Sequence, residues 1–188
     1  MLTITDELDA INIMLASIGS DPVDSLIDST DVDVANAMRI LETESRNIQR
    51  KGWDFNRGTY TLYPNEYDHK ILWDNTIIYF KSSDSNVYVK RGDYFYDMTN
   101  QTFEFKDKIE LEIIRAIDFI DLPDCFKNYI ACKAAMSFQA RYFGDGNVAQ
   151  ALQMDLMEAQ QDIVEYDLNM SDVNMLNLTN VAEVMTRS

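Results

Sequence analysis

Four carboxylates on one predicted helix have the spacing of a reactive cluster. Asp155, Glu158, Asp162 and Glu165 follow one another at steps of three, four and three, so they form a stripe along one helix face. Carboxylates of this kind bind metal ions or act as the acid and nucleophile of a glycosidase. Metal sites in helical bundles usually add a Glu-x-x-His motif, which this helix lacks. We therefore interpret the stripe as a solvated face or the lining of a channel.

The other residues that could do chemistry lack partners at a useful spacing. His69, the only histidine, lies in a loop rich in acidic residues, with no nucleophile placed near it. Cys125 and Cys132 would lie about 10 Å apart along one helix, too far for a disulfide, and no histidine is near to activate them. The string GDGN lacks the lysine and the spacing of a phosphate loop. We predict no catalytic residue, no cofactor and no metal site.

A short basic string contrasts with the rest of the chain. RNIQRKGWDFNRG, residues 46–58, holds Arg46, Arg50, Lys51 and Arg57 around a tryptophan and a phenylalanine, although the chain has a net charge of −16. The first three cations lie in the last turns of a predicted helix, where positive charge is favourable next to exposed carbonyl groups. We interpret the string as an element of the fold. The alternative is a DNA-binding site, which predicts an affinity for DNA that falls steeply as the salt concentration rises.

Composition favours a soluble acidic protein. The 188 residues suit one domain with a sizeable core, since 46% of them are hydrophobic. The 32 acidic residues against 16 basic ones argue against sequence-independent binding of nucleic acid. Two free thiols suit a reducing compartment. The acidic N-terminal segment lacks the apolar stretch of a signal peptide, and no apolar run is long enough to span a membrane, so we expect synthesis in the cytoplasm and no membrane insertion.

Apolar residues recur at helical spacing in four segments. The pattern predicts helices over residues 3–18, 33–51, 123–143 and 147–166. The apolar stripes are Ile4, Leu8, Ile11, Leu15 and Ile18; Val34, Met38, Leu41 and Ile48, interrupted by Ser45; Phe126, Ile130, Ala134 and Phe138; and Val148, Leu152, Leu156, Ala159, Ile163 and Tyr166. Four such helices can bury their stripes against one another as a bundle.

Between the second and third helices the pattern changes to that of short strands. TYTLY, IIYF, VYVK, YFYD, FEF and IELEII are rich in aromatic and β-branched residues, which predicts an antiparallel β insertion over residues 58–118. The predicted fold is therefore α+β and mainly α: a four-helix bundle with a small inserted antiparallel sheet and an extended C-terminal segment, residues 167–188. We treat the whole chain as one domain.

Two segments are candidates for contact with partner proteins. In the hairpin VYVKRGDYFYD we expect Tyr88, Tyr94 and Tyr96 to share one face with Arg91 at the tip, and both residue types are frequent at protein interfaces. Cross-strand packing in the core is the alternative. The C-terminal segment poses the same choice between a frayed tail and a docking segment. Its apolar candidates are Val173, Met175, Leu178 and Val181.

Five longer strings resemble one protein family. LDAINIMLASIGSDPVDSL, DVANAMRILETESRNIQRKGWDFN, VYVKRGDYFYD, IIRAIDFIDLPDCFKNYI and KAAMSFQARYFGD occur in the order and spacing of the tail tubular protein A family, the head-to-tail adaptors of short-tailed bacteriophages. The resemblance extends from about residue 7 to residue 145, and the helix predicted after residue 145 is also consistent with the family. It implies a structural protein of the virion with no enzymatic activity.

The resemblance also implies a set of partners. Members of the family form a twelve-membered ring between the portal protein and the tail nozzle protein, tail tubular protein B, near the attachment of the tail fibres. The genome passes through the ring during ejection. We expect double-stranded DNA to pass without specific binding, since Asp155, Glu158, Asp162 and Glu165 facing the lumen would repel phosphates within a Debye length of about 8 Å. The alternative function is degradation of surface glycans, which the many carboxylates and aromatic residues allow.

Overall fold

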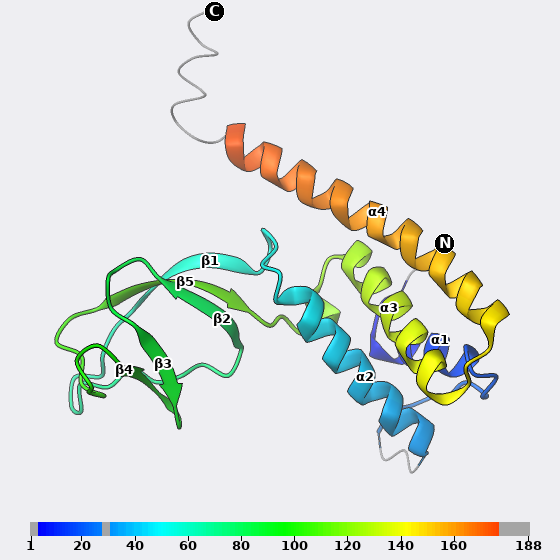
Figure 1. Ribbon diagram of the computed structural model, residues 1–188, viewed down its shortest axis with the longest axis horizontal. Coiled ribbons are helices and arrows are strands. Elements are labelled where there is room, and N and C mark those ends of the chain that lie inside the picture. The colour runs from blue at the N-terminus through cyan, green and yellow to red at the C-terminus, as the bar shows by residue number, and fades with distance from the viewer. Residues whose placement is uncertain (1–3, 28–30, 177–188) are drawn as a thin grey trace, which may run out of the picture. The chain divides into compact units, whose positions relative to one another are not determined.

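The computed structural model describes residues 4–27 and 31–176, and the chain divides into two compact units (Figure 1). The helical unit comprises residues 1–48 and 118–188, and the β unit comprises residues 49–117. In chain order the elements are α1 (Glu7–Ala16), α2 (Val32–Gln49), β1 (Arg57–Leu62), β2 (Ile77–Ser82), β3 (Tyr88–Arg91), β4 (Tyr94–Asp97), β5 (Ile109–Arg115), a 3-10 turn (Phe119–Asp121), α3 (Asp124–Tyr142) and α4 (Gly146–Leu176). This order confirms the α+β, mainly α class and places the strands between the second and third helices.

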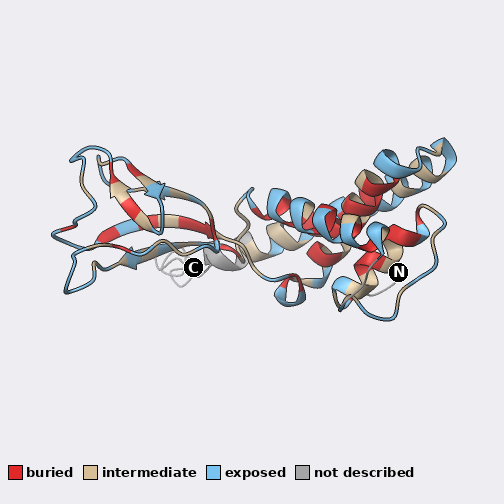
Figure 2. Cartoon of the chain, turned by 90° about the horizontal axis from the view of Figure 1, so that it is seen from below, coloured by how far each residue is buried: buried red, intermediate tan, exposed pale blue. Residues whose placement is uncertain are grey.

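The helical unit is built around α3. Phe126, Ile130, Ala134 and Phe138, the predicted stripe of this helix, are all fully buried. Both α1 and α4 pack against α3, and on α2 the Glu44 carboxylate accepts a 2.7 Å hydrogen bond from the Ser137 hydroxyl of α3. The buried residues are drawn red in Figure 2, which shows that each unit has an interior of its own.

The buried face of α2 differs in part from the predicted stripe. Met38 was expected to face the core, but 39% of its surface is exposed. The buried residues instead follow steps of three, four, four and three through Val34, Ala37, Leu41, Ser45 and Ile48. A second difference concerns Ser45, which was treated as a break in the stripe but is 8% exposed and belongs to the buried face.

The helix α4 continues for ten residues beyond its predicted end. It begins after Asp145, whose carboxylate accepts hydrogen bonds from the backbone N–H groups of Asn147 and Val148 at 2.8 and 3.0 Å. The predicted end at Tyr166 was wrong, because the helix continues to Leu176. No glycine or proline interrupts it after Gly146, so nothing in the backbone forces an earlier end. The expectation of an extended segment is therefore wrong for residues 167–176, and residues 177–188 lie outside the described part.

The β unit holds a three-stranded antiparallel sheet and a separate hairpin. β5 is the central strand, in the order β1-β5-β2, and β3 pairs with β4. Its core gathers around Phe95, which is fully buried, with its ring centroid 4.8 Å from that of Trp73 and 5.4 Å from that of Phe80. The predicted strand FEF is absent, although Phe105 is buried in this core.

Candidate assembly surfaces

Two amides of the basic string close the β unit where the chain enters and leaves it. The Gln49 side chain donates a 3.0 Å hydrogen bond to the Ile117 carbonyl and accepts one of 2.7 Å from the Ile117 N–H. The Asn56 amide donates to the carbonyls of Gln49 and Arg115 at 2.9 and 3.0 Å and accepts from the Trp53 N–H at 2.9 Å. Both side chains are buried, with 1% and 3% of their surface exposed. We call these two residues the amide clasp.

A glycine between the two amides is required by the geometry. Gly52 has φ +78°, a conformation that L side chains rarely adopt, and a Cβ atom there would lie 2.6 Å from Cδ1 of Ile114. The string therefore builds the fold at this point, with its amides and its glycine in the interior. From the sequence, the two amides were not identified as interior residues.

The cations of the string lie outside the clasp. Arg46, Arg50 and Lys51 are exposed, and the Lys51 ammonium lies 5.8 Å from the centroid of the Trp53 ring. The Arg57 guanidinium is 3.6 Å from the Glu112 carboxylate. These are ordinary surface contacts of modest energy, and the DNA-binding site remains an untested alternative.

The outer face of the hairpin carries cations and aromatic rings. Because Arg91 pairs with Tyr94 and Val89 with Tyr96, these four side chains point to the same side. The Arg91 guanidinium lies 3.8 Å from the Tyr96 ring centroid, and the Lys70 ammonium lies 5.2 Å from that of Tyr94. We call Lys70, Arg91, Tyr94 and Tyr96 the cationic hairpin face.

Tyr88 does not belong to that face. It pairs with Asp97, both residues point to the inner side of the hairpin, and only 6% of Tyr88 is exposed. Its ring packs near Phe105, with centroids 5.8 Å apart. The expectation that all three tyrosines share one face is therefore wrong for Tyr88, which is the cross-strand core residue that the alternative described.

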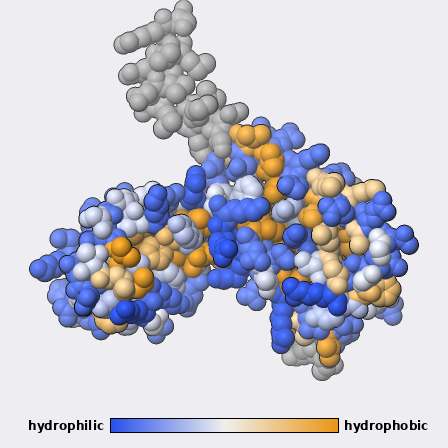
Figure 3. All heavy atoms as spheres, in the orientation of Figure 1, coloured by the Kyte–Doolittle hydropathy of each residue, from blue (hydrophilic) through white to orange (hydrophobic). Residues whose placement is uncertain are grey.

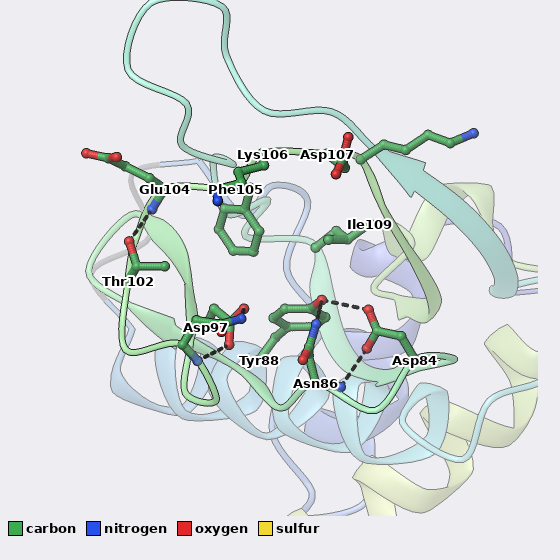
Figure 4. Close-up of a pocket in the computed structure, with 12 residues that line it drawn as sticks. Asp84, Asn86, Tyr88, Asp97, Thr102, Glu104, Phe105, Lys106, Asp107 and Ile109 are labelled. Atoms are coloured by element: carbon green, nitrogen blue, oxygen red, sulfur yellow. Dashed lines mark hydrogen bonds between the residues drawn. The ribbon is translucent and has the colours of Figure 1, made fainter.

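A cavity of about 450 Å³ opens beside the inner side of the hairpin (Figure 4). The Tyr88 hydroxyl points to Asp84 and donates a 2.7 Å hydrogen bond to its carboxylate. Burial, together with the hydrogen bond to Asp84, raises the pKa of Tyr88 to about 12. The Asp97 carboxylate accepts from the N–H groups of Thr99 and Asn100 at 2.8 and 2.9 Å.

The carboxylates of Asp84 and Asp97 have structural roles. A glycosidase needs one carboxylic acid with a raised pKa, but the pKa of Asp84 is lowered, because hydrogen bonds from Ser82, Tyr88 and the Asn86 N–H outweigh the opposing effect of burial. Each carboxylate thus stabilises a turn through its own local hydrogen bonds.

The long helix α4 presents a second apolar stripe on its outer side. Leu156, Ala159 and Ile163 are buried on the inner side, whereas Met157 and Leu168 have 55% and 61% of their surface exposed. A shallow groove of about 480 Å³ follows this outer side. Its lining consists of Met157, Gln160, Gln161, Val164, Glu165 and Leu168.

The four predicted lumen-facing acids form a flank between these two stripes. Asp155, Glu158 and Glu165 are exposed and Asp162 is half-buried. Burial raises the pKa of both Cys132 and Cys125, and the negative charges of Asp155 and Glu158 raise the first further and that of Asp162 the second, so part of the flank lies beside α3. Val173 and Met175 lie in the last turns of α4, while Leu178 and Val181 lie outside the described residues.

Alkylation of Cys132 at pH 8 is expected to be slow. Burial, followed by the charges of Asp155 and Glu158, raises its pKa from 9.0 to about 11, so about 100-fold less thiolate is present. The folded state holds this proton more tightly than the unfolded state, so the contribution to stability is full below pH 9 and is lost as the pH rises towards 11. Iodoacetamide kinetics of a Cys125→Ser variant, with and without urea, measure the difference. Equal rates in the two conditions would show that the thiol is not shifted.

Three further observations bear on function. Across residues 4–27 and 31–176, no three His, Cys, Asp or Glu side chains come together in a way that could hold a metal ion. Within the same ranges, no helix combines the length and apolar character that crossing a membrane requires. His69 is exposed in a loop, as expected, with φ +55°.

Comparison with known proteins gives two matches. A family model described as "Tail tubular protein" matches residues 8–173, a range that includes residues of both units. The chain is also similar to the protein named tail tubular protein A of Klebsiella phage KP34. The two are 29% identical over 149 residues, which cover 78% of this chain and 79% of that protein.

Proposed function

The chain belongs to the tail tubular protein family and is a structural protein of a phage tail, and on this premise we propose that it is the head-to-tail adaptor. In this proposal, copies of the chain form a ring, with twelve as the expected number, between the portal protein above and the tail nozzle protein below. Tail fibres attach near it, and the ring is needed for tail assembly and for passage of the genome. Its proposed role is to bind these neighbouring proteins, and it catalyses no reaction.

The observation that carries the proposal is the family match over both units. A connector must bind several neighbours at once, and large interfaces need apolar and aromatic residues at the surface. The chain offers two such surfaces in different units: the cationic hairpin face and the outer stripe of α4. These surfaces support a protein that assembles with others.

The charge of the chain is divided unevenly, which supports unhindered passage of DNA. The β unit has 10 basic and 11 acidic residues, a net charge of −1, whereas the helical unit has 6 basic and 21 acidic residues, a net charge of −15. We propose that the acidic flank of α4 faces the bore of the ring. Carboxylates there would repel DNA phosphates within about 8 Å, so duplex DNA would slide without binding.

Electron microscopy of the protein mixed with its portal protein tests the adaptor proposal. The expected result is a ring on the distal face of the portal, to which the nozzle protein then binds, and the same polypeptide at the exit vertex of purified particles. Particles that lack the chain at this vertex would overturn the proposal. A ring whose bore is lined by basic side chains would overturn the proposal for the acidic flank alone.

Removal of residues 177–188 is expected to weaken ring formation or portal binding while the helical signal in circular dichroism stays unchanged. These residues include Leu178 and Val181, two of the predicted docking residues, and the deletion leaves every described element in place. Removal of residues 1–3 is the matched control. Unchanged binding of portal and nozzle by the C-terminal deletion variant would show that this segment does not dock.

A further inference from the structure

We propose that the outer stripe of α4 docks on the cationic hairpin face of a neighbouring copy of the same chain. The inference deepens the proposed function, on which it rests for the premise that copies assemble. It names the two surfaces that meet between adjacent subunits, and it follows from the apolar spacing, the charges and the symmetry of the contact.

The outer stripe has the spacing of a helix that packs along its length. Positions 154, 157, 161, 164 and 168 repeat at steps of three and four, and four of them are apolar: Met154, Met157, Val164 and Leu168. Between 46% and 61% of each of these four side chains is exposed. Figure 3 shows hydrophobic residues at the surface of α4 beside the grey C-terminal residues. An exposed apolar stripe of this kind, interrupted at Gln161, usually marks an interaction site.

The charges of α4 restrict what can cover this stripe. Residues 146–176 contain six acidic residues and no lysine, arginine or histidine. Glu165 lines the groove itself, and Glu158 is exposed on the adjoining flank. Two α4 helices packed against each other would bring like charges together without a cation to separate them. The partner surface must therefore combine apolar groups with positive charge.

The cationic hairpin face fulfils this requirement. Asp97, the only acid of the two strands, points to the inner side and is buried, so the strand residues on the outer side include no acid; the exposed Asp93 belongs to the turn. Among the described residues neither Arg91 nor Lys70 forms a salt bridge. Exposed Leu72 and Met98 extend the apolar part, the first through its bridge to Tyr94 and the second 3.4 Å from the Arg91 guanidinium.

The symmetry of the contact matches a ring. A helix of one subunit that binds a hairpin of the next uses two different surfaces, so each copy keeps one of each free for a further neighbour. Contacts of this head-to-tail kind close into rings when the rotation between subunits allows it. The net charge of −15 on one unit and −1 on the other favours this pairing over contacts between two helical units.

Photo-crosslinking identifies the surface that covers α4. A photoreactive p-benzoylphenylalanine replaces Leu168, isotopically heavy and light protein are mixed, and assembly is followed alone at high concentration and on the portal. The expected crosslink joins α4 of one copy to residues 87–98 of another, as a heavy–light pair. Crosslinks to another α4, to residues 177–188, to the portal or within one chain would overturn the inference, as would none in assembled rings.

Charge reversal tests the same contact by affinity. Arg91→Glu and Glu165→Lys are each expected to weaken self-association about tenfold or more, and their combination should recover part of the loss. Lys81→Glu, on the exposed side of β2, is the matched control and should change little. Equal losses for the control, or no recovery in the double variant, would contradict the pairing.

The outcomes separate the inference from the proposed function. Rings that form on the portal with Leu168 against a different surface overturn the inference and leave the adaptor proposal intact. Failure of the chain to self-associate, both at high concentration and on the portal, overturns both. Folding of each variant is checked by circular dichroism and by the fluorescence of Trp53 and Trp73.

Discussion

Replacing Asn56 with alanine is expected to lower the free energy of unfolding of the β unit by about 3 kcal/mol, because three hydrogen bonds of a buried side chain are lost. The substitution leaves the carbonyls of Gln49 and Arg115 and the N–H of Trp53 without the amide that they bind at 2.9 to 3.0 Å. Water cannot easily restore these hydrogen bonds, because only 3% of the surface of Asn56 is exposed.

Urea unfolding followed by tryptophan fluorescence measures this effect selectively. Trp53 and Trp73, the only two tryptophans, both lie in the β unit, whereas the signal at 222 nm in circular dichroism comes mainly from the helices. Asn75→Ala is the matched control, since that amide is exposed, and it should cost less than about 0.5 kcal/mol. Asn56→Asp keeps the shape but loses both donors. If the Asn56→Asp variant were as stable as the unchanged protein, the shape of the side chain, and not its hydrogen bonds, would be what stabilises the clasp.

Replacing Phe95 with alanine should destabilise the same unit by about 4 kcal/mol, the loss typical of removing a buried aromatic ring. Phe95 is fully buried, and its ring forms a cluster with those of Trp73 and Phe80, so its removal leaves a cavity that the two strands of a short hairpin cannot easily close. We expect a lower urea midpoint by fluorescence together with an altered emission of Trp73, because its ring loses its nearest aromatic neighbour.

The control for Phe95 is a ring on the other side of the hairpin. Phe103 is 37% exposed and contacts Tyr96 with centroids 4.8 Å apart, so Phe103→Ala should cost about 1 kcal/mol. Similar losses for both variants would contradict the placement of the core on the inner side. In both variants the helical signal should persist at urea concentrations where fluorescence has already changed, since each unit has a core of its own.

Periodicity predicted the helices well where one face is buried along the whole length. The stripe of α3 was correct at every position because this helix is covered by neighbours throughout. The end of α4 was missed because the predicted stripe ended at Tyr166, although Met170 continues its spacing and is half-buried, and the helix goes on to Leu176.

The hairpin shows why a correct strand prediction can assign a residue to the wrong face. Both strands and the turn at Gly92 were predicted, and Gly92 has φ +60° as the tight turn requires. The two-residue turn pairs Arg91 with Tyr94, so an even-numbered residue on β3 lies opposite an odd-numbered residue on β4. Tyr88 therefore faces away from Tyr94 and Tyr96, although all three have even numbers. The strand register depends on the length of the turn, and the pattern of aromatic residues does not reveal that length.

The amide clasp was missed for a different reason. Gln49 and Asn56 are polar residues in a string rich in charges, and polar residues are usually exposed. Their signal was indirect: Gly52 lies midway between them at a forced turn, and an amide can bind both an N–H and a carbonyl of another strand. Only the return of the chain at Ile117, 68 residues after Gln49, reveals the partner.

The clasp also has a consequence for the inheritance of the β unit. The Gln49 side chain donates one hydrogen bond to Ile117 and accepts another from it, so the first and last residues of the unit are held together. The segment therefore contains the residues that join its two ends. A recombination event with breakpoints just outside these residues would transfer the segment as a cassette, together with the glycine and both amides. Phages could in this way exchange the hairpin while each recipient retains its own helices.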